Sequence, residues 1–220
     1  MKTKTLLLAL ACLLPVCVNA QEKTVDLKIE LPPVVLTGTP VPIKIQNLEP
    51  ARKGSREVLK VPEGTTNLAL NKPVTSSDKS PIVGELSYIT DGDKDGDEGY
   101  EVELMPGVQW VQIDLQKESN IYAICVWHYH RQKRAYRSVV VQISNDPAFK
   151  TGVTTVFNTD YDNVTKLGEG KDMSYIETNE GKLIPVSNVK GRYVRLYSAG
   201  NTTNTGNHYV EVDVYGKVAK

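Results

Sequence analysis

The chain has 220 residues, and its 26 lysine and arginine side chains balance 26 aspartate and glutamate side chains, so the formal net charge is zero. This length allows one good-sized domain with an appendage. A balanced charge creates no strong field that would attract nucleic acid or an anionic membrane. We therefore expect no nucleic-acid partner and no membrane insertion.

The first 20 residues have the pattern of an export signal. Lys2 and Lys4 precede the apolar run of residues 6–18, and the tripeptide ending at Ala20 has the small residues of a signal-peptidase site. The sequence thus predicts a signal peptide over residues 1–20. The mature protein is expected to be secreted, into the periplasm or the extracellular space.

Cys125 is the one cysteine outside that segment, and it lies in the apolar run of residues 121–127. A small buried hydrophobic residue is favoured there over a reactive thiol. With a single cysteine, no intrachain disulfide can hold the mature chain together. The hydrophobic core, with or without a metal ion, must do so.

Residues 21–66 differ from the rest because prolines interrupt short runs that favour β-structure, at Pro32, Pro33, Pro40, Pro42, Pro50 and Pro62. Proline lacks the N–H donor of a strand interior, so these runs are edge strands or extended linker. We interpret residues 51–60 as a solvated tether, although Val58, Leu59 and Val61 offer apolar side chains for docking. The segment is therefore predicted to be an N-terminal arm, which ends near residue 66.

Residues 67–216 contain the strand patterns of one domain, followed by a tail at 217–220. Every second side chain is apolar in residues 110–115, and this period of two recurs in residues 139–143, 194–196 and 210–214. Residues 121–127 are apolar on both faces, which is typical of a fully buried strand. Trp110 and Trp127 are both expected in the core. These features, with connections rich in glycine, asparagine and aspartate, predict an all-β sandwich or jelly roll.

Six short motifs occur in the order typical of a known family, at residues 67–74, 89–93, 110–115, 140–144, 191–196 and 211–216. Together they resemble the discoidin, or coagulation factor 5/8 type C, family, which includes the galactose-binding-like family 32 carbohydrate-binding modules. Residues 127–215 also resemble bacterial secreted discoidin-domain proteins. The resemblance implies an eight-stranded jelly-roll β-sandwich, whereas the loops that decide the ligand vary within such folds.

The densest group of acidic side chains runs from residue 91 to residue 98. Alternating carboxylates with glycine offer the hard oxygen ligands that Ca²⁺ prefers. A helix-loop-helix calcium site is rejected because its twelfth position is Val102 instead of glutamate, and no helices flank the loop. The family resemblance instead implies a structural Ca²⁺ held by Asp91, Asp93 and Glu211 with backbone carbonyls. A solvated acidic loop without metal is the alternative.

Residues 127–134 place aromatic and basic side chains at the end of the predicted buried strand. Sugar-binding members of the family have an arginine–glutamine pair at this place, and Arg131 and Gln132 match it. A planar guanidinium can donate to two neighbouring hydroxyls, while an aromatic face packs on the C–H surface of a sugar. The resemblance therefore implies that this pair binds a carbohydrate.

His208 and Tyr209 are predicted to add a polar contact and an aromatic platform opposite Arg131, and His130 joins the same predicted ligand site. His128 and His130 share one strand face, as zinc or copper ligands do in some sites, but no third ligand is evident. The alternative is that His128 is a satisfied histidine near the core and that the basic cluster is a solvated strand end.

The leading prediction is a secreted, non-catalytic carbohydrate-binding module for galactose-like or other cell-surface or polysaccharide sugars. The alternative is an extracellular protein-interaction or adhesion domain of the cell envelope, in which the arm engages a protein partner and no sugar binds. An enzyme is disfavoured, because no nucleophile with a neighbouring base stands out and Cys125 is expected to be buried.

Overall fold

A computed structural model describes residues 22–39 and 41–219, so the predicted signal peptide lies outside the described residues. These residues form β-strands and one short 3₁₀ helix, η1 (Leu86–Thr90). The prediction of an all-β sandwich is confirmed. Over the described part of the chain, no helix is both long and apolar enough to cross a membrane.

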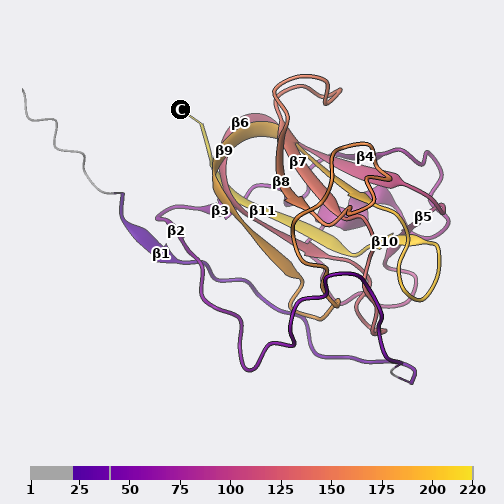
Figure 1. Ribbon diagram of the computed structural model, residues 1–220. Helices are drawn as coiled ribbons and strands as arrows, with labels where there is room; N and C mark the ends of the chain where they lie inside the picture. The colour runs from indigo at the N-terminus through magenta and orange to yellow at the C-terminus, as the bar shows by residue number, and fades with distance from the viewer. Residues whose placement is uncertain (1–21, 40, 220) are drawn as a thin grey trace, which may run out of the picture.

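Most strands belong to one antiparallel sheet of order β3-β11-β6-β9-β7-β8, with β4 paired to β6 beside this path (Figure 1). Their bounds are Thr66–Asn67 (β3), Val74–Ser76 (β4), Gln109–Trp127 (β6), Val140–Ser144 (β7), Thr154–Asn158 (β8), Lys182–Ser198 (β9) and Glu211–Val218 (β11). A second sheet pairs β5 (Val102–Leu104) with β10 (Asn207–Tyr209). Strand β11 continues two residues beyond residue 216, the expected end of the domain.

The two longest strands, β6 and β9, pair along most of their length and curve together (Figure 1). Their register shifts between Asp114 and Ser119. Gln116, inside this interval, has a φ of 66°, a backbone conformation suited to a bulge. The irregularity bends the strand pair, and so one continuous pair wraps around the core.

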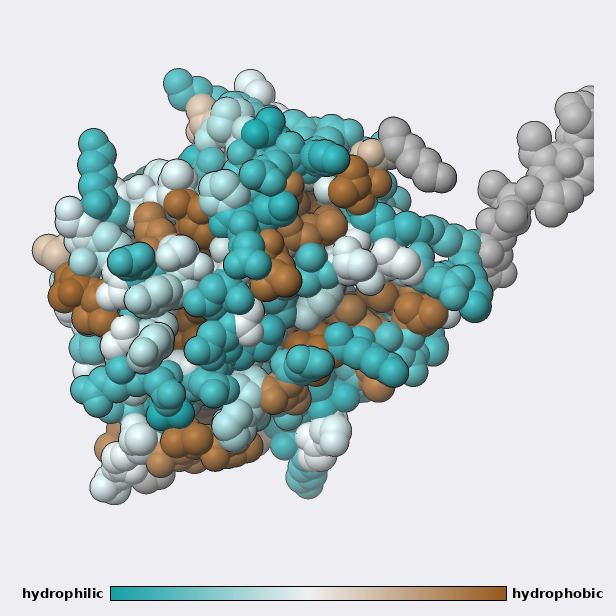
Figure 2. Space-filling view, turned by 180° about the vertical axis from the view of Figure 1, so that it is seen from behind, coloured by the Kyte–Doolittle hydropathy of each residue, from teal (hydrophilic) through white to brown (hydrophobic). Residues whose placement is uncertain are grey.

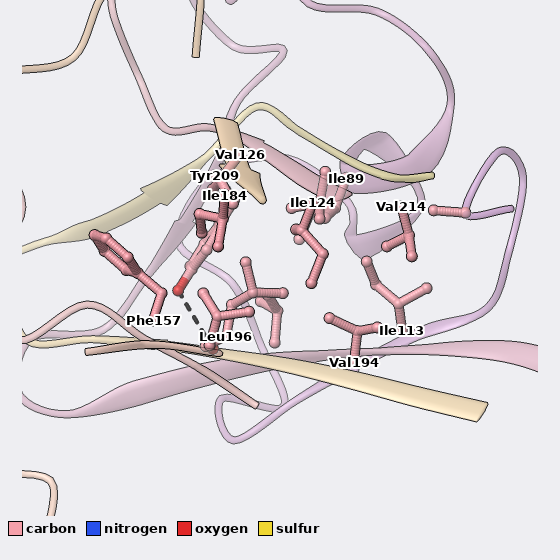
Figure 3. Packing of buried hydrophobic residues seen from close by; sticks show 14 of the residues in the cluster. Ile89, Ile113, Ile124, Val126, Phe157, Ile184, Val194, Leu196, Tyr209 and Val214 are labelled. Carbon is pink, nitrogen blue, oxygen red and sulfur yellow. Dashed lines mark hydrogen bonds between the residues drawn. The ribbon is translucent and has the colours of Figure 1, made fainter. Parts of the chain in front are cut away.

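The main core consists of the apolar side chains that alternate along the central strands. Val111 and Ile113 of β6, Val194 and Leu196 of β9, and Val212 and Val214 of β11 are all fully buried, and Figure 3 shows several of them packed together. Trp127 is also fully buried, as predicted. Trp110 is only half-buried, against expectation, because it has the opposite parity to Val111 and points outward, where Arg195 stacks on its ring.

The arm packs against the domain along much of its length. Strand β1 (Thr24–Asp26) pairs with β2 (Lys60–Pro62), and Figure 1 shows the indigo chain between them running along the lower edge of the sandwich. Val61 is buried, and Leu59 packs against the second core cluster, which contains Cys125 and Trp127. The stretch 51–60 is therefore partly docked instead of being a purely solvated tether.

Exposed hydrophobic side chains are scattered over the surface. On the face seen in Figure 2 they form small groups separated by hydrophilic residues. The arm contributes several of the exposed side chains, namely Leu31, Val34, Leu36, Val41 and Val58. Single exposed hydrophobic residues are normal on a soluble domain, so only those that line a cavity suggest a binding role.

Candidate functional site

A pocket with a cavity volume of about 440 Å³ opens beside the segment that follows β6. Four separate parts of the chain build its walls. They are the arm (Thr37), the acidic loop (Glu98 and Glu101), the segment after β6 (Tyr129, Arg131, Gln132 and Arg134) and the region of β10 (Asn204 and His208). The pocket is therefore a tertiary feature, because these residues are widely spaced in the sequence.

Alternation of side chains beyond β6 decides which of them reach the pocket. Tyr129 and Arg131 line it, whereas His128 and His130 are buried behind it. His128 Nδ1 lies 2.7 Å from Glu177 Oε1, so one ring nitrogen is paired within the core, whereas the buried Nε2 has no hydrogen-bond partner among the described residues. The two histidines do not meet at a metal site.

Arg134 is held firmly at the pocket wall. Its side chain is nearly fully buried, and Nη2 donates to Gln132 Oε1 at 2.5 Å. The guanidinium carbon lies 4.8 Å from the centroid of the Tyr129 ring, a cation–π contact. Because both neighbours restrain it, the planar guanidinium is preorganised to face a ligand.

Arg131 is anchored to the acidic loop. Its Nε donates to the carbonyl oxygen of Asp95 at 3.1 Å, and its guanidinium forms an ion pair with Asp97. The predicted pair Arg131–Gln132 thus lies at the pocket, where one member holds the acidic loop and the other orients Arg134.

His208 is neutral at physiological pH. Burial first, and then the positive charge of Arg134, lower the pKa of His208 to about 4, although Glu103 Oε1 lies 3.4 Å from its Nε2. Burial and the charge on Glu101 raise the pKa of Tyr129, so its hydroxyl stays protonated. The formal charges of the pocket lining cancel, because two arginines face two glutamates.

This arrangement suits a ligand rich in hydroxyl groups. Guanidinium N–H groups donate, and the carboxylates of Glu98 and Glu101 accept, so both roles of a hydroxyl are matched. Tyr129 supplies an aromatic side chain beside them. With balanced charges, the pocket offers little net attraction to a strongly charged ligand.

A second polar cluster surrounds the start of β11. The backbone N–H of Gly92 donates to Glu211 Oε2 at 3.2 Å, so the acidic turn and the last strand meet as predicted. Glu211 is fully buried, and its Oε1 has no hydrogen-bond partner among the described residues. Burial first, and then the charges of Asp213 and Asp91, raise the pKa of Glu211 to about 9.

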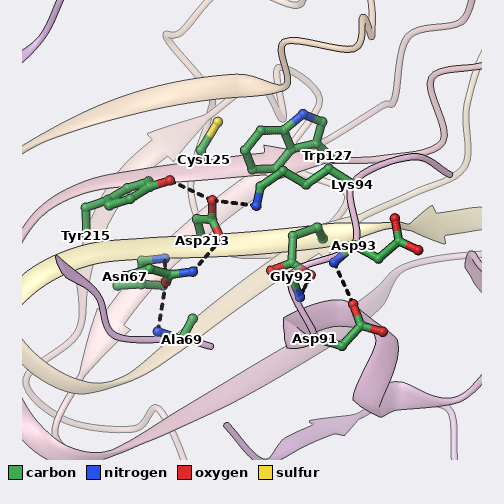
Figure 4. A network of polar contacts seen from close by, with 12 residues as sticks. Asn67, Ala69, Asp91, Gly92, Asp93, Lys94, Cys125, Trp127, Asp213 and Tyr215 are labelled. Atoms are coloured by element: carbon green, nitrogen blue, oxygen red, sulfur yellow. Dashed lines mark hydrogen bonds and ion pairs between the residues drawn. The ribbon is translucent and has the colours of Figure 1, made fainter. Parts of the chain in front are cut away.

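The two aspartates of the turn are used differently from Glu211. Asp91 Oδ1 accepts from the backbone N–H of Asp93 at 2.8 Å, and Asp93 Oδ1 accepts from that of Asp95 at 2.9 Å. Figure 4 shows both carboxylates on the side of the turn away from Asp213. The structure therefore brings Glu211 to the turn, while the Asp91 and Asp93 carboxylates both accept hydrogen bonds within the loop.

The chemistry of this cluster fits a cation in one respect. The orphaned Glu211 Oε1 is a buried oxygen without a donor, which a hard cation such as Ca²⁺ would satisfy. Across residues 22–39 and 41–219, however, no three His, Cys, Asp or Glu side chains are grouped as metal ligands. Backbone carbonyls would have to supply most of the oxygen ligands.

Comparison with known proteins agrees with the fold and identifies the family. A family model for the F5/8 type C domain matches residues 73–212. The chain belongs to the F5/8 type C domain family. The comparison with curated proteins finds no similar sequence.

Two solved structures illustrate what this F5/8 type C domain is similar to. Chitosan-binding module 1 of a chitosanase/glucanase from Paenibacillus sp. IK-5 is 25% identical, with a TM-score of 0.50, and the match covers 69% of this chain and 99% of that one. A family 89 glycoside hydrolase from Clostridium perfringens matches with 16% identity and a TM-score of 0.51, over 70% of this chain and 15% of that one. The second likeness shows the fold alone.

The structure of this F5/8 type C domain separates the predicted ligand residues into two groups. Arg131, Gln132 and His208 line the pocket. His130 lies behind it, with its Nε2 2.8 Å from the carbonyl oxygen of Lys94. Tyr209 is fully buried in the core (Figure 3), with its hydroxyl 3.2 Å from Ser198 Oγ.

The prediction that Tyr209 forms a platform is therefore wrong, and strand geometry explains why. His208 and Tyr209 are neighbours on β10, so they point to opposite faces. Since His208 faces the pocket, Tyr209 must face the core. The aromatic side chain at the pocket is Tyr129.

Sequence reasoning also missed Tyr129, Arg134 and the two glutamates of the pocket. Tyr129 was detectable, because it shares strand parity with Arg131. Glu98 and Thr37 gave no such signal, because they reach the pocket only through the packing of distant segments.

Proposed function

We propose that this protein is a secreted, non-catalytic carbohydrate-binding module that holds a neutral, galactose-like sugar in the pocket beside β6. The observation that carries the proposal is a single charge-balanced pocket in which two arginines and two glutamates surround Tyr129. Paired donors and acceptors around an aromatic side chain are what a sugar ring with neighbouring hydroxyls requires.

Each wall has a distinct role in this proposal. Arg134 donates to ligand hydroxyls, and Gln132 holds it in place. Glu98 and Glu101 accept hydrogen bonds from the same ring, and Tyr129 contacts its C–H surface. His208, being neutral, offers a polar edge without adding charge.

Similarity supports a saccharide as the class of ligand. The similar module from Paenibacillus sp. IK-5 is named for binding chitosan. That name belongs to a related binding module, and it favours a binding role over catalysis for this chain too. We expect glycoside hydrolysis assays with the purified protein to give no activity.

The test is a glycan array probed with residues 21–220, followed by calorimetry on soluble sugars. The array carries mono-, di- and trisaccharides of galactose, glucosamine, N-acetylglucosamine and mannuronic acid. Arg134→Met should weaken binding about 10- to 100-fold, because hydrogen bonds to a charged group are each worth roughly 1.5–3 kcal/mol. No binding to any of these sugars would refute the proposal.

A matched control separates the loss of a site from damage to the fold. Arg195 also stacks on an aromatic ring, with its guanidinium carbon 4.3 Å from the Trp110 centroid, and it hydrogen-bonds Gln112, but it does not line the pocket. Arg195→Met should leave sugar affinity unchanged. Equal losses in both arginine variants would contradict the role given to Arg134.

We propose in addition that Glu211, with backbone carbonyls of the acidic turn, holds a structural Ca²⁺. The support is the buried Glu211 Oε1 without a partner. The ion would neutralise the buried carboxylate and stabilise the acidic turn. It has no part in catalysis.

Thermal unfolding with and without Ca²⁺ tests this site. Ca²⁺ at 100 times its Kd should stabilise the protein by about 2.7 kcal/mol, and a chelator should reverse the gain. Glu211→Gln should abolish the effect, while Asp95→Asn, in the same acidic loop, should retain it. Superimposable melting curves with Ca²⁺ and with chelator would remove the assignment.

A further inference from the structure

The arm passes directly over the edge of the proposed sugar pocket. The backbone N–H of Thr37 donates to the carbonyl oxygen of Arg131 at 2.6 Å, and Thr37 Oγ1 donates to the same oxygen at 3.1 Å. Thr37 thereby forms part of the pocket wall. The family match begins only at residue 73, so this wall lies outside the matched region.

The arm is fastened on both sides of this contact. Before it, Asn179 Nδ2 donates to the carbonyl oxygen of Pro32 at 2.8 Å. After it, Ser174 N–H donates to the Asn47 carbonyl at 3.0 Å, and Glu49 N–H donates to the Ser174 carbonyl at 2.8 Å. The arm is therefore held against the domain before and after Thr37, as well as at Thr37 itself.

A second pocket, with a cavity volume of about 210 Å³, lies between the arm and the domain. Its arm side is formed by Leu36, Thr37, Gly38, Thr39 and Val41, and its domain side by Gln132, Lys133 and Thr203. Thr37 and Gln132 line both pockets. The two cavities are therefore neighbours that share a wall.

The second pocket also has the chemistry of a saccharide site. Leu36 and Val41 are 62% and 61% exposed, and they offer an apolar surface for the C–H face of a sugar ring. Thr39, Thr203 and Lys133 offer hydroxyl and ammonium groups for its polar edge. Apolar groups from the arm, with polar groups from both the arm and the domain, match the apolar and polar faces of a sugar.

We infer that the arm completes an extended saccharide site, in which the larger pocket takes one sugar residue and the arm-lined pocket takes the next residue of the same chain. The inference rests on the proposed function and deepens it. The preferred ligand is accordingly an oligosaccharide or polysaccharide, and Leu36, Val41 and Thr37 are residues that determine this preference.

The test compares chain lengths in paired arm variants. Calorimetry measures wild-type affinity for galactose, galactobiose and galactotriose, and for glucosamine, chitobiose and chitotriose. Leu36→Ser with Val41→Ser removes the apolar surface of the second pocket. Val34→Ser with Val58→Ser, which changes side chains that are 74% and 65% exposed on the same arm but outside both pockets, is the matched control.

One of the two sugar series, galactose or glucosamine, should bind. In that series, the wild-type protein and the Val34→Ser/Val58→Ser control should bind the disaccharide at least about tenfold more tightly than the monosaccharide. The Leu36→Ser/Val41→Ser variant should lose this gain and keep its monosaccharide affinity. Equal affinity for all chain lengths, or equal behaviour of the two arm variants, would overturn the inference while the sugar pocket stands. If none of these sugars binds, or if Arg134→Met changes nothing, the proposed function itself fails.

Discussion

Two polar clusters of this protein each contain a cation over an aromatic ring, but the cation has a different role in each. At the pocket, the Arg134 guanidinium lies 4.8 Å from the centroid of Tyr129 and is held by a neutral amide of Gln132. In the cluster at β11, the Lys94 ammonium lies 5.2 Å from the centroid of Trp127 and 3.3 Å from the carboxylate of Asp213. Both are cations over aromatic rings.

The difference lies in the partners of the two cations. Asp213 is almost fully buried and also accepts from Asn67 and Tyr215 (Figure 4). Its charge is neutralised inside the protein, so the cluster contributes to folding. Arg134 is also nearly buried, but it lines a pocket and has no carboxylate as its direct hydrogen-bond partner there. Its charge remains available to a ligand.

The largest expected effect comes from breaking the closed cluster. Asp213→Ala removes the partner of a largely buried Lys94 and should destabilise the protein by about 3–5 kcal/mol, because an uncompensated buried charge remains. Chemical denaturation measures the loss. Gln132→Ala, at the open pocket, should lower stability far less but weaken sugar binding. The distinction between the two clusters would be wrong if Asp213→Ala left the free energy of unfolding unchanged, or if Gln132→Ala lowered it more.

A smaller effect, dependent on pH, is expected at the open pocket. Burial and Arg134 lower the pKa of His208 from 6.5, its ordinary value, to about 4 in the folded protein. Between these two pH values, His208 is protonated in the unfolded chain but neutral in the folded protein. This stabilising contribution is complete above pH 6.5 and is lost as the pH falls towards 4. Between pH 7 and pH 4.5 the loss should be about 2–3 kcal/mol.

The His208→Gln variant isolates this contribution, since glutamine keeps polar atoms but does not titrate. Denaturation curves at the two pH values should show a smaller loss in the variant than in wild type. The groups near His208 are Glu103, Arg134 and His128, with the rings of Tyr129 and Tyr136 beside it. Identical losses in both proteins would show that folding does not lower the pKa of His208.

The smallest expected effect is on stability, and it comes from a residue that lies in the core next to the pocket. Tyr209→Phe removes a buried hydroxyl that contacts Ser198, and it should cost about 1 kcal/mol of unfolding free energy. Sugar affinity should not change, because Tyr209 faces the core. Tyr129→Phe is the comparison at the pocket. A loss of affinity in Tyr209→Phe would show that its buried hydroxyl supports the pocket.

Strand patterns in the sequence predicted the architecture well. Alternation placed Val111 and Ile113 on one buried face, and the apolar run around Cys125 proved to be buried on both faces. Burial raises the pKa of the Cys125 thiol to about 12, so it is no reactive nucleophile. These features follow from a period of two, which a single segment reveals without knowledge of its neighbours.

The candidate site was predicted only in part. Arg131, Gln132 and His208 were expected at one place and do line one pocket. The arm was expected to be a linker or an independent binding segment, yet Thr37 docks on Arg131. That contact joins residues 94 positions apart, and nothing in the composition of either segment indicates it.

By itself, the sequence determined the all-β class, the order of the family motifs and which side chains along each strand are apolar, because these depend on local periodicity. Only the tertiary structure decided which neighbour of a pair faces the ligand, as for His208 and Tyr209, and which distant loops close the pocket. The physical reason is that a binding site needs side chains from several segments within hydrogen-bond reach. That proximity is set by packing, not by spacing along the chain.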